Sequence, residues 1–229
     1  MIIRVLNGVL SLGLLVLIGW AVLALPESPG GLTGQALARL PESGVSNPVT
    51  AALLNYRAYD TLLEIAVFLL AVVGVWSVRE GGIEKVDTEE RGLLLALLRL
   101  VPPVLAMAGG YLLWAGSSAP GGAFQGGALL GGALVLLLVA GRGRAALKQE
   151  RGLRCGLVLG LVVFMAAGAV VMLRTGALLQ YPRGSAGGWI LAIEAAALVS
   201  VGLAFGGLFL GGRPAAGDAT ARGKESAHE

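Results

Sequence analysis

The sequence predicts an all-α integral membrane protein with six transmembrane helices and both termini in the cytoplasm. Hydrophobic residues make up 56% of the 229 residues and charged residues only 14%, and the mean hydropathy is +0.81. A soluble domain carries roughly 25% charged residues, so this composition excludes soluble enzymes and soluble nucleic-acid-binding proteins. The pI near 9.4 does not indicate nucleic acid, because basic residues in a membrane protein mark its orientation.

Six apolar stretches each reach or approach the ~20 residues that cross a ~30 Å hydrocarbon core. These stretches are residues 2–25, 49–78, 93–116, 123–140, 153–173 and 189–211. The first stretch is longer than the roughly 7–15 apolar residues of a signal peptide, which favours a retained transmembrane helix. The third and fourth stretches share a run without charge, residues 100–141, so only a tight turn separates them.

Basic residues are divided unevenly between the loops. With six spans, both termini and two of the loops lie on one side of the membrane and hold twelve Lys and Arg residues, against three in the opposite loops. The positive-inside rule therefore places both termini in the cytoplasm. A charged linker separates a two-helix part, residues 1–90, from a four-helix part, residues 91–212. The small and polar tail, residues 213–229, is predicted to be disordered.

Three ionisable residues, Arg57, Asp60 and Glu64, begin the second span. At about 100° per residue, their spacing puts them on one face of a helix. Arg57 and Asp60 fall near the membrane interface, where an ion pair that pins the helix is the alternative to a place on an ion path. Glu64 lies ~9 Å deeper, beyond the reach of its short side chain. It is a candidate site for H⁺ or transient Na⁺, and the alternative is a buried, hydrogen-bonded carboxyl group.

Glu194 is the acidic residue of the last span. It follows Trp189, a residue type favoured at membrane interfaces, by five positions, so we expect its depth to match that of Glu64. Two carboxyl groups at one depth suit a relay of H⁺ or Na⁺. The alternative for Glu194 is a buried polar contact with a partner subunit.

The third span combines a charge with two consecutive prolines. Arg99 either extends its long side chain to the cytoplasmic surface or faces carbonyl groups inside the protein. Pro102 and Pro103 lack backbone N–H donors and predict a kink that frees such carbonyls.

The turn at residues 116–127 is rich in glycine and carries no charge. It lacks the Gly-Lys-Ser/Thr ending of a phosphate-binding loop, so tight packing of two helices is the better interpretation. The chain has one cysteine and one histidine, with no nucleophile–base pair and no dinucleotide motif. We therefore expect neither catalysis by this chain nor a bound cofactor.

Two segments resemble known families. Residues 47–64, with the pattern Arg-x-x-Asp-Thr-x-x-Glu, resemble the last part of the large Mrp antiporter subunit MrpA, which is the separate subunit MbhE in membrane-bound hydrogenases. The turn resembles that of the MrpB (MnhB) family at Pro120, Gly121, Gly122 and Phe124, and Glu194 fits the acidic position of that family's last helix. Two serines replace the usual His-Asn pair of the turn, so no imidazole is available there.

The resemblance implies a fusion of an MbhE-like module, residues 1–90, with an MnhB-like module, residues 91–212. It implies a subunit of a multi-subunit Na⁺/H⁺ antiporter in a bacterial or archaeal cytoplasmic membrane. The implied partners are other Mrp- or Mbh-type membrane subunits, Na⁺, H⁺ and the bilayer, and no nucleic acid. Two alternatives remain open, which are an equivalent subunit of a membrane-bound hydrogenase-type complex and a structural scaffold that binds no ion.

Overall fold

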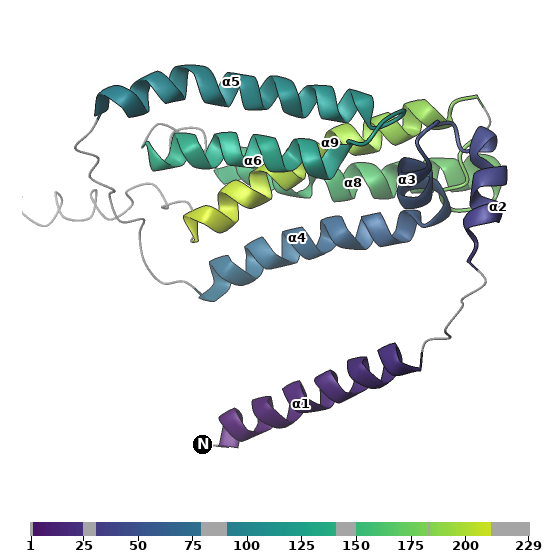
Figure 1. The fold of residues 1–229 in the computed structure, drawn as a ribbon, viewed down its shortest axis with the longest axis horizontal. Helices are drawn as coiled ribbons and strands as arrows, with labels where there is room; N and C mark the ends of the chain where they lie inside the picture. The colour runs from purple at the N-terminus through teal and green to yellow at the C-terminus, as the bar shows by residue number, and fades with distance from the viewer. Residues whose placement is uncertain (1, 25–30, 79–90, 141–149, 183, 212–229) are drawn as a thin grey trace, which may run out of the picture. The chain divides into compact units, whose positions relative to one another are not determined.

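The computed structural model of the chain describes residues 2–24, 31–78, 91–140, 150–182 and 184–211 (Figure 1). Within these ranges five helices are long and apolar enough to cross a membrane: α1 (Ile2–Leu23), α4 (Ala58–Val78), α5 (Arg91–Ala115), α8 (Glu150–Thr175) and α9 (Ala186–Leu210). A sixth apolar helix, α6 (Ala123–Val139), has 17 residues. At 1.5 Å per residue it is about 25 Å long, slightly short of a full span.

The prediction of an all-helical membrane protein is confirmed, with five long apolar helices and a shorter one. The sidedness of the termini stays a prediction, and the tail at residues 213–229 lies outside the described residues. The predicted boundary between the two modules, at residue 90, also lies outside them.

The described part of the connector before the second span contains short helices. These are α2 (Thr33–Ala38) and a 3₁₀ turn, η1 (Leu40–Glu42). The next helix, α3 (Pro48–Ala51), begins where Asn47-Pro48 predicts, and the Asn47 side chain accepts a 3.0 Å hydrogen bond from the Val49 N–H. An N-cap of this kind satisfies one of the free N–H groups at the start of a helix.

The second predicted span is interrupted. A π-helical turn, η2 (Ala52–Tyr56), follows α3, and Arg57 then leaves helical geometry with φ −125° and ψ 38° before α4 begins. The Thr61 hydroxyl donates a 2.6 Å hydrogen bond to the Leu53 carbonyl across this break. The expectation of a continuous helix over residues 49–78 is therefore wrong here, because hydrophobic periodicity does not detect a single wide turn.

The chain divides into two compact units, residues 1–35 and residues 36–229. The first unit contains α1, whose described side chains from Val5 onward are all exposed. A helix that is apolar on every side, with no partner among the described residues of its own unit, has the surface of a membrane span.

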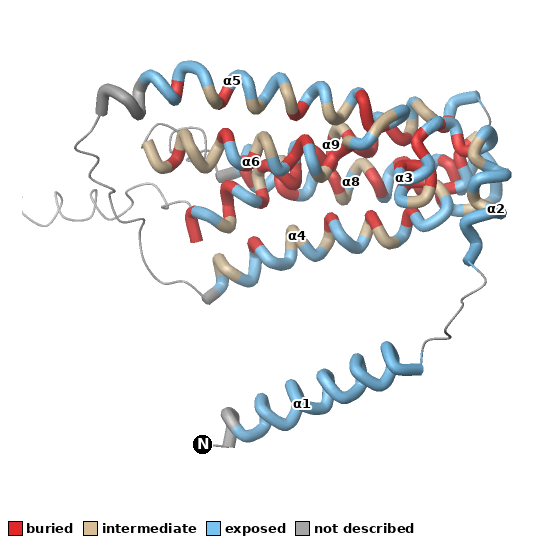
Figure 2. The backbone as a smooth tube through the Cα atoms, in the orientation of Figure 1, coloured by how far each residue is buried: buried red, intermediate tan, exposed pale blue. Residues whose placement is uncertain are grey.

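In the second unit α9 is the central helix, and it contacts α4, α5, α6 and α8. Buried residues occur on all sides of α9, and Figure 2 shows burial concentrated along it and around α3. Residues before the charged linker, in α3, η2 and α4, thus share one core with α8 and α9.

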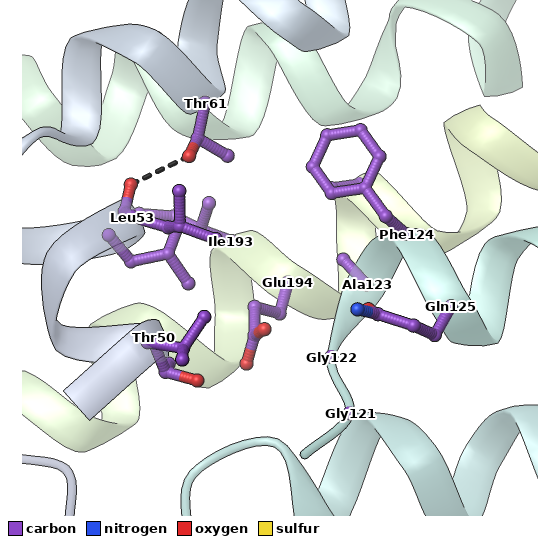
Figure 3. A pocket seen from close by; sticks show the side chains of 13 residues that line it. Thr50, Leu53, Thr61, Gly121, Gly122, Ala123, Phe124, Gln125, Ile193 and Glu194 are labelled. Carbon is purple, nitrogen blue, oxygen red and sulfur yellow. Dashed lines mark hydrogen bonds between the residues drawn. The ribbon is translucent and has the colours of Figure 1, made fainter. Parts of the chain in front are cut away.

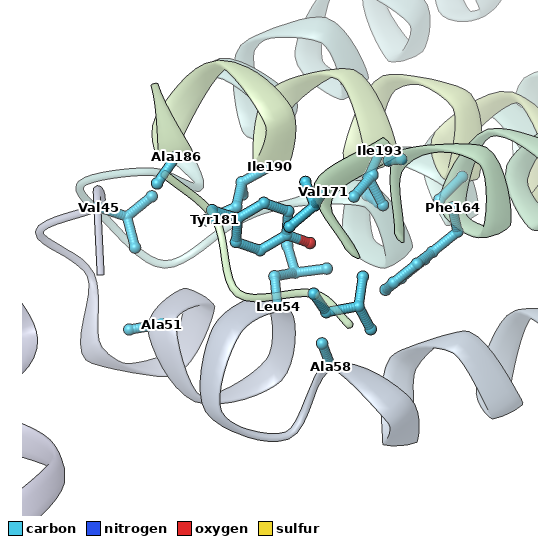
Figure 4. Packing of buried hydrophobic residues seen from close by; sticks show 14 of the residues in the cluster. Val45, Ala51, Leu54, Ala58, Phe164, Val171, Tyr181, Ala186, Ile190 and Ile193 are labelled. Carbon is cyan, nitrogen blue, oxygen red and sulfur yellow. The ribbon is translucent and has the colours of Figure 1, made fainter. Parts of the chain in front are cut away.

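Tyr181, in the connection between α8 and α9, belongs to this core. Figure 4 shows its ring among Leu54, Val171 and Ile190. Its hydroxyl is buried without a hydrogen-bond partner among the residues that the structure describes, and burial raises the pKa of Tyr181. An unpaired buried hydroxyl is unfavourable, so the ring rather than the hydroxyl stabilises this packing.

Glycines let α6 approach its neighbours closely. A Cβ atom on Gly126 would lie 2.7 Å from the Gly109 carbonyl oxygen of α5 and 2.6 Å from Leu198 Cδ1 of α9. A Cβ atom on Gly131 would lie 2.6 Å from Phe205 Cβ. Such small residues permit close helix contact in membranes, where packing rather than the hydrophobic effect holds helices together.

Gly126→Ala is expected to destabilise the protein by about 1–3 kcal/mol, because the added methyl group meets a backbone carbonyl that cannot rotate away. Gly132→Ala is the matched control on the same helix, since no atom lies within 4 Å of the added Cβ. Thermal unfolding of the detergent-solubilised complex, followed by tryptophan fluorescence, would compare them. Equal midpoints for the two variants would contradict the packing of α5, α6 and α9.

Candidate functional site

A small cavity of about 50 Å³ lies where three parts of the chain meet (Figure 3). The interrupted second span, the start of α6 and the middle of α9 line it. Its polar side chains are Thr50, Thr61, Gln125 and Glu194. The remaining lining is mostly apolar, and a cavity of this volume has room for a few water molecules beside the polar groups.

Glu194 of α9 is the ionisable group that lines the cavity, and it is only 5% exposed. Its carboxyl group accepts a hydrogen bond from the backbone N–H of Ala123, the first residue of α6. The N-terminus of a helix carries partial positive charge and free N–H groups, and both favour an anion. Glu194 thus serves as the capping acceptor of α6 from another helix.

Gly122 makes this arrangement possible. It immediately precedes α6, and its φ of +113° is a backbone conformation that residues with a side chain rarely adopt. As a glycine it also has no side chain that could cap the helix. A Cβ atom at this position would lie 2.6 Å from Glu194 Oε1. The neighbouring Gly121 is equally constrained, because a Cβ there would lie 2.5 Å from the Leu112 carbonyl oxygen. The two glycines bring the backbone against the carboxyl group.

The interrupted part of the second span forms another wall of the cavity that contains Glu194. Thr61 is 4% exposed, lines the cavity and satisfies the Leu53 carbonyl through its hydroxyl. Thr50 lies on the same wall, and its hydroxyl donates a 2.5 Å hydrogen bond to the Gly116 carbonyl. In membrane proteins, irregular backbone of this kind is tolerated where it is buried or lines a cavity.

The start of α3 fixes the turn between α5 and α6. The Asn47 amide donates hydrogen bonds of 3.1 Å and 2.7 Å to the carbonyls of Gly116 and Ala119. The backbone N–H groups of Ser46 and Asn47 both donate to the Ser117 carbonyl at 3.0 Å. Two segments about 70 residues apart in sequence are thus held together next to Glu194.

The ionisable residues of the second span lie elsewhere. Arg57 and Asp60 form an ion pair whose side chains are 74% and 41% exposed, which fits the interfacial alternative. Glu64 is exposed on the surface of α4 and does not line the Glu194 cavity. Because Arg57 precedes α4, only Asp60 and Glu64 share a helix face. The described residues of its own unit, 36–211, do not bury Glu64.

The remaining predicted residues fall into two groups. Phe124 joins Gly121 and Gly122 at the cavity, and its ring packs 6.0 Å from that of Phe68. In α5, by contrast, the helix runs uninterrupted through Pro102 and Pro103, and Arg99 is exposed. Neither Arg99 nor these prolines line the cavity.

Sequence reasoning missed Thr61, Thr50 and Gln125 as cavity residues, and it missed the contact between Glu194 and the α6 turn. One signal for the contact was available. A helix that begins after Gly-Gly has no capping side chain of its own, so a distant acceptor is needed. Within the described ranges no three or more His, Cys, Asp or Glu residues converge as metal ligands, so any bound cation would also use hydroxyl or carbonyl oxygens.

Comparison with known proteins gives four findings. Residues 93–211 match the model of a domain related to the MnhB subunit of the Na⁺/H⁺ antiporter. A chain of the membrane-bound sulfane sulfur reductase (MBS), an archaeal respiratory membrane complex, matches with a TM-score of 0.68 and 26% sequence identity, covering 91% of this chain and 97% of that one. No curated protein matches.

A chain of the Mrp complex from Dietzia sp. DQ12-45-1b has the same fold. It matches with a TM-score of 0.61 and 19% identity, over 92% of this chain and 26% of that longer one. Each structural match covers more than nine-tenths of this chain and therefore includes residues that precede the MnhB-related domain.

Proposed function

We infer the function from the family to which this chain belongs, that of the domain related to the MnhB subunit of the Na⁺/H⁺ antiporter, which covers residues 93–211. We propose that the chain is a membrane subunit of an Mrp-type Na⁺/H⁺ antiporter and helps to line its ion path. The multi-pass helical fold and the match to a chain of an Mrp complex support this assignment.

One observation carries the ion-path part of the proposal, the burial of Glu194 in a small cavity that also contains Thr50, Thr61 and Gln125, within membrane-spanning helices. A carboxyl group at membrane depth is costly unless it is paired, protonated or hydrated, and such residues usually mark ion or proton routes. A carboxyl group takes up H⁺ and also offers the hard oxygen ligands that cations such as Na⁺ prefer.

The cavity contains groups that suit an alternation between H⁺ and a cation. With Na⁺ present, the Glu194 carboxylate and water would supply oxygen ligands. With H⁺ present, the neutral carboxyl group would keep its hydrogen bond from Ala123. The chain would thus contribute one station of the path, while other Mrp- or Mbh-type subunits in a bacterial or archaeal cytoplasmic membrane supply the rest.

A second candidate is the equivalent subunit of a respiratory membrane complex. The favouring observation is the MBS match, which has the higher TM-score and covers 97% of that chain. An MbhE-like identity for residues 1–90 fits either candidate and belongs to the same proposal. A scaffold that binds no ion is the remaining alternative.

Purification of the affinity-tagged chain from native membranes would test the assignment. We expect co-purifying Mrp-type membrane subunits, and vesicles of the complex that move H⁺ when a Na⁺ gradient is imposed, read from a pH-sensitive dye. Co-purification of subunits with iron–sulfur or nickel–iron sites would establish the respiratory candidate instead. A chain that purifies alone would contradict both.

A further inference from the structure

We propose that the α4 face that carries Glu64 binds a membrane helix of another subunit, and that this helix presents a lysine or arginine to Glu64. This inference does not depend on the role of Glu194. It concerns the outer surface of the chain rather than the cavity.

The first step is the position of Glu64. It is exposed at the seventh residue of α4, and the neighbouring Leu63 and Val67 are each 62% exposed. No residue from 65 to 78 is charged. A carboxylate at such a place does not face lipid stably, and in membrane proteins such groups face protein or water. Within residues 36–211 no described side chain covers Glu64, and the stretch from Val5 to Leu25 contains no basic residue. We therefore assign the basic partner of Glu64 to another subunit.

The second step is the charge on this face. Asp60 lies one turn before Glu64, and Arg57 already pairs with it. Among the described residues Glu64 has no ion pair of its own. The face therefore carries one uncompensated acidic group, and a basic side chain is its electrostatic complement.

The third step is the shape of the face. Ala71 and Gly74 lie seven and ten residues after Glu64, which at about 100° per residue puts them about 20° and about 80° from Glu64 around the helix. Both are exposed, and a Cβ on Gly74 would meet no atom within 4 Å. Small residues on the same helix let a second helix approach closely. Lipid chains, by contrast, pack against a helix surface without small residues.

Photo-crosslinking in the intact complex tests the proposal. With benzoylphenylalanine in place of Val67, we expect crosslinks to one other subunit, at a membrane segment that contains Lys or Arg. Glu64→Lys should lower the crosslink yield by about tenfold or more. Charge reversal of the crosslinked basic residue should then restore the yield in the Glu64→Lys background.

Three results would overturn the proposal. The first is crosslinks to lipid alone, to residues 1–35 of the same chain or to a second copy of this chain. The second is a crosslinked segment without a basic residue. The third is a yield that Glu64→Lys leaves unchanged. Glu64→Gln keeps the shape of the side chain, so a lower yield in that variant supports the ionic contact separately from any loss of folding, and an unchanged yield contradicts it.

Discussion

Glu194→Gln is expected to reduce Na⁺-coupled H⁺ movement by the reconstituted complex roughly 10-fold to 100-fold, while assembly stays normal. Glutamine preserves the size of the side chain and still accepts the hydrogen bond from the Ala123 N–H. It cannot bind and release H⁺, and it offers a cation a neutral oxygen in place of a carboxylate. The measurement is the initial rate of Na⁺-driven pH change in vesicles, normalised to the amount of assembled complex.

Glu194→Ala separates an ion-binding role from a purely structural one. Alanine removes the acceptor at the N-terminus of α6, so assembly should weaken as well as transport. Transport that survives in Glu194→Gln but fails in Glu194→Ala would favour the scaffold alternative. Loss in both variants, with normal assembly of Glu194→Gln, supports the ion path.

Gly122→Ala is expected to impair both stability and transport. The φ of +113° is strained for alanine, and the new Cβ would lie 2.6 Å from Glu194 Oε1. A strained backbone position of this kind costs about 1–3 kcal/mol, and the carboxyl group must also move away from α6. Thermal unfolding and the vesicle assay would measure the two effects.

Gly110→Ala is the matched control for this variant. It lies in the preceding helix α5, and nothing is within 4 Å of its added Cβ. A double-mutant cycle sharpens the test, because Gly122→Ala should cost less when Glu194 is already alanine. Equal costs in the two backgrounds would show that Gly122 and Glu194 are not coupled.

Much of the fold was predictable because long apolar runs have few alternatives in a membrane. The described helices α5, α8 and α9 begin and end within three residues of the predicted stretches. The π-helical turn at Ala52–Tyr56 was not predictable from hydrophobicity, since its residues fit a regular apolar helix equally well. That one wide turn is what separates Arg57 from the helix of Asp60 and Glu64.

Individual residues of the site were predictable from the sequence, but the contacts between them were not. Glu194 was selected from its expected depth in the membrane, and Gly121, Gly122 and Phe124 were selected from their resemblance to the MnhB turn. Depth counting paired Glu194 with Glu64, but depth specifies a level in the membrane and not a direction around the helix. The tertiary contacts of α9 with α6 decide that direction, and they turn Glu194 toward Ala123 while Glu64 remains on the outer surface of α4.

The central claim is that the Glu194 carboxyl group takes up H⁺ and exchanges it for a cation. Infrared difference spectroscopy of the complex tests this most directly, because a protonated carboxyl group has a C=O stretching band that the carboxylate lacks. The account predicts that added Na⁺ or a rise in pH removes such a band from the wild-type complex, and that the change is missing in Glu194→Gln. The same difference spectrum in both complexes would contradict it.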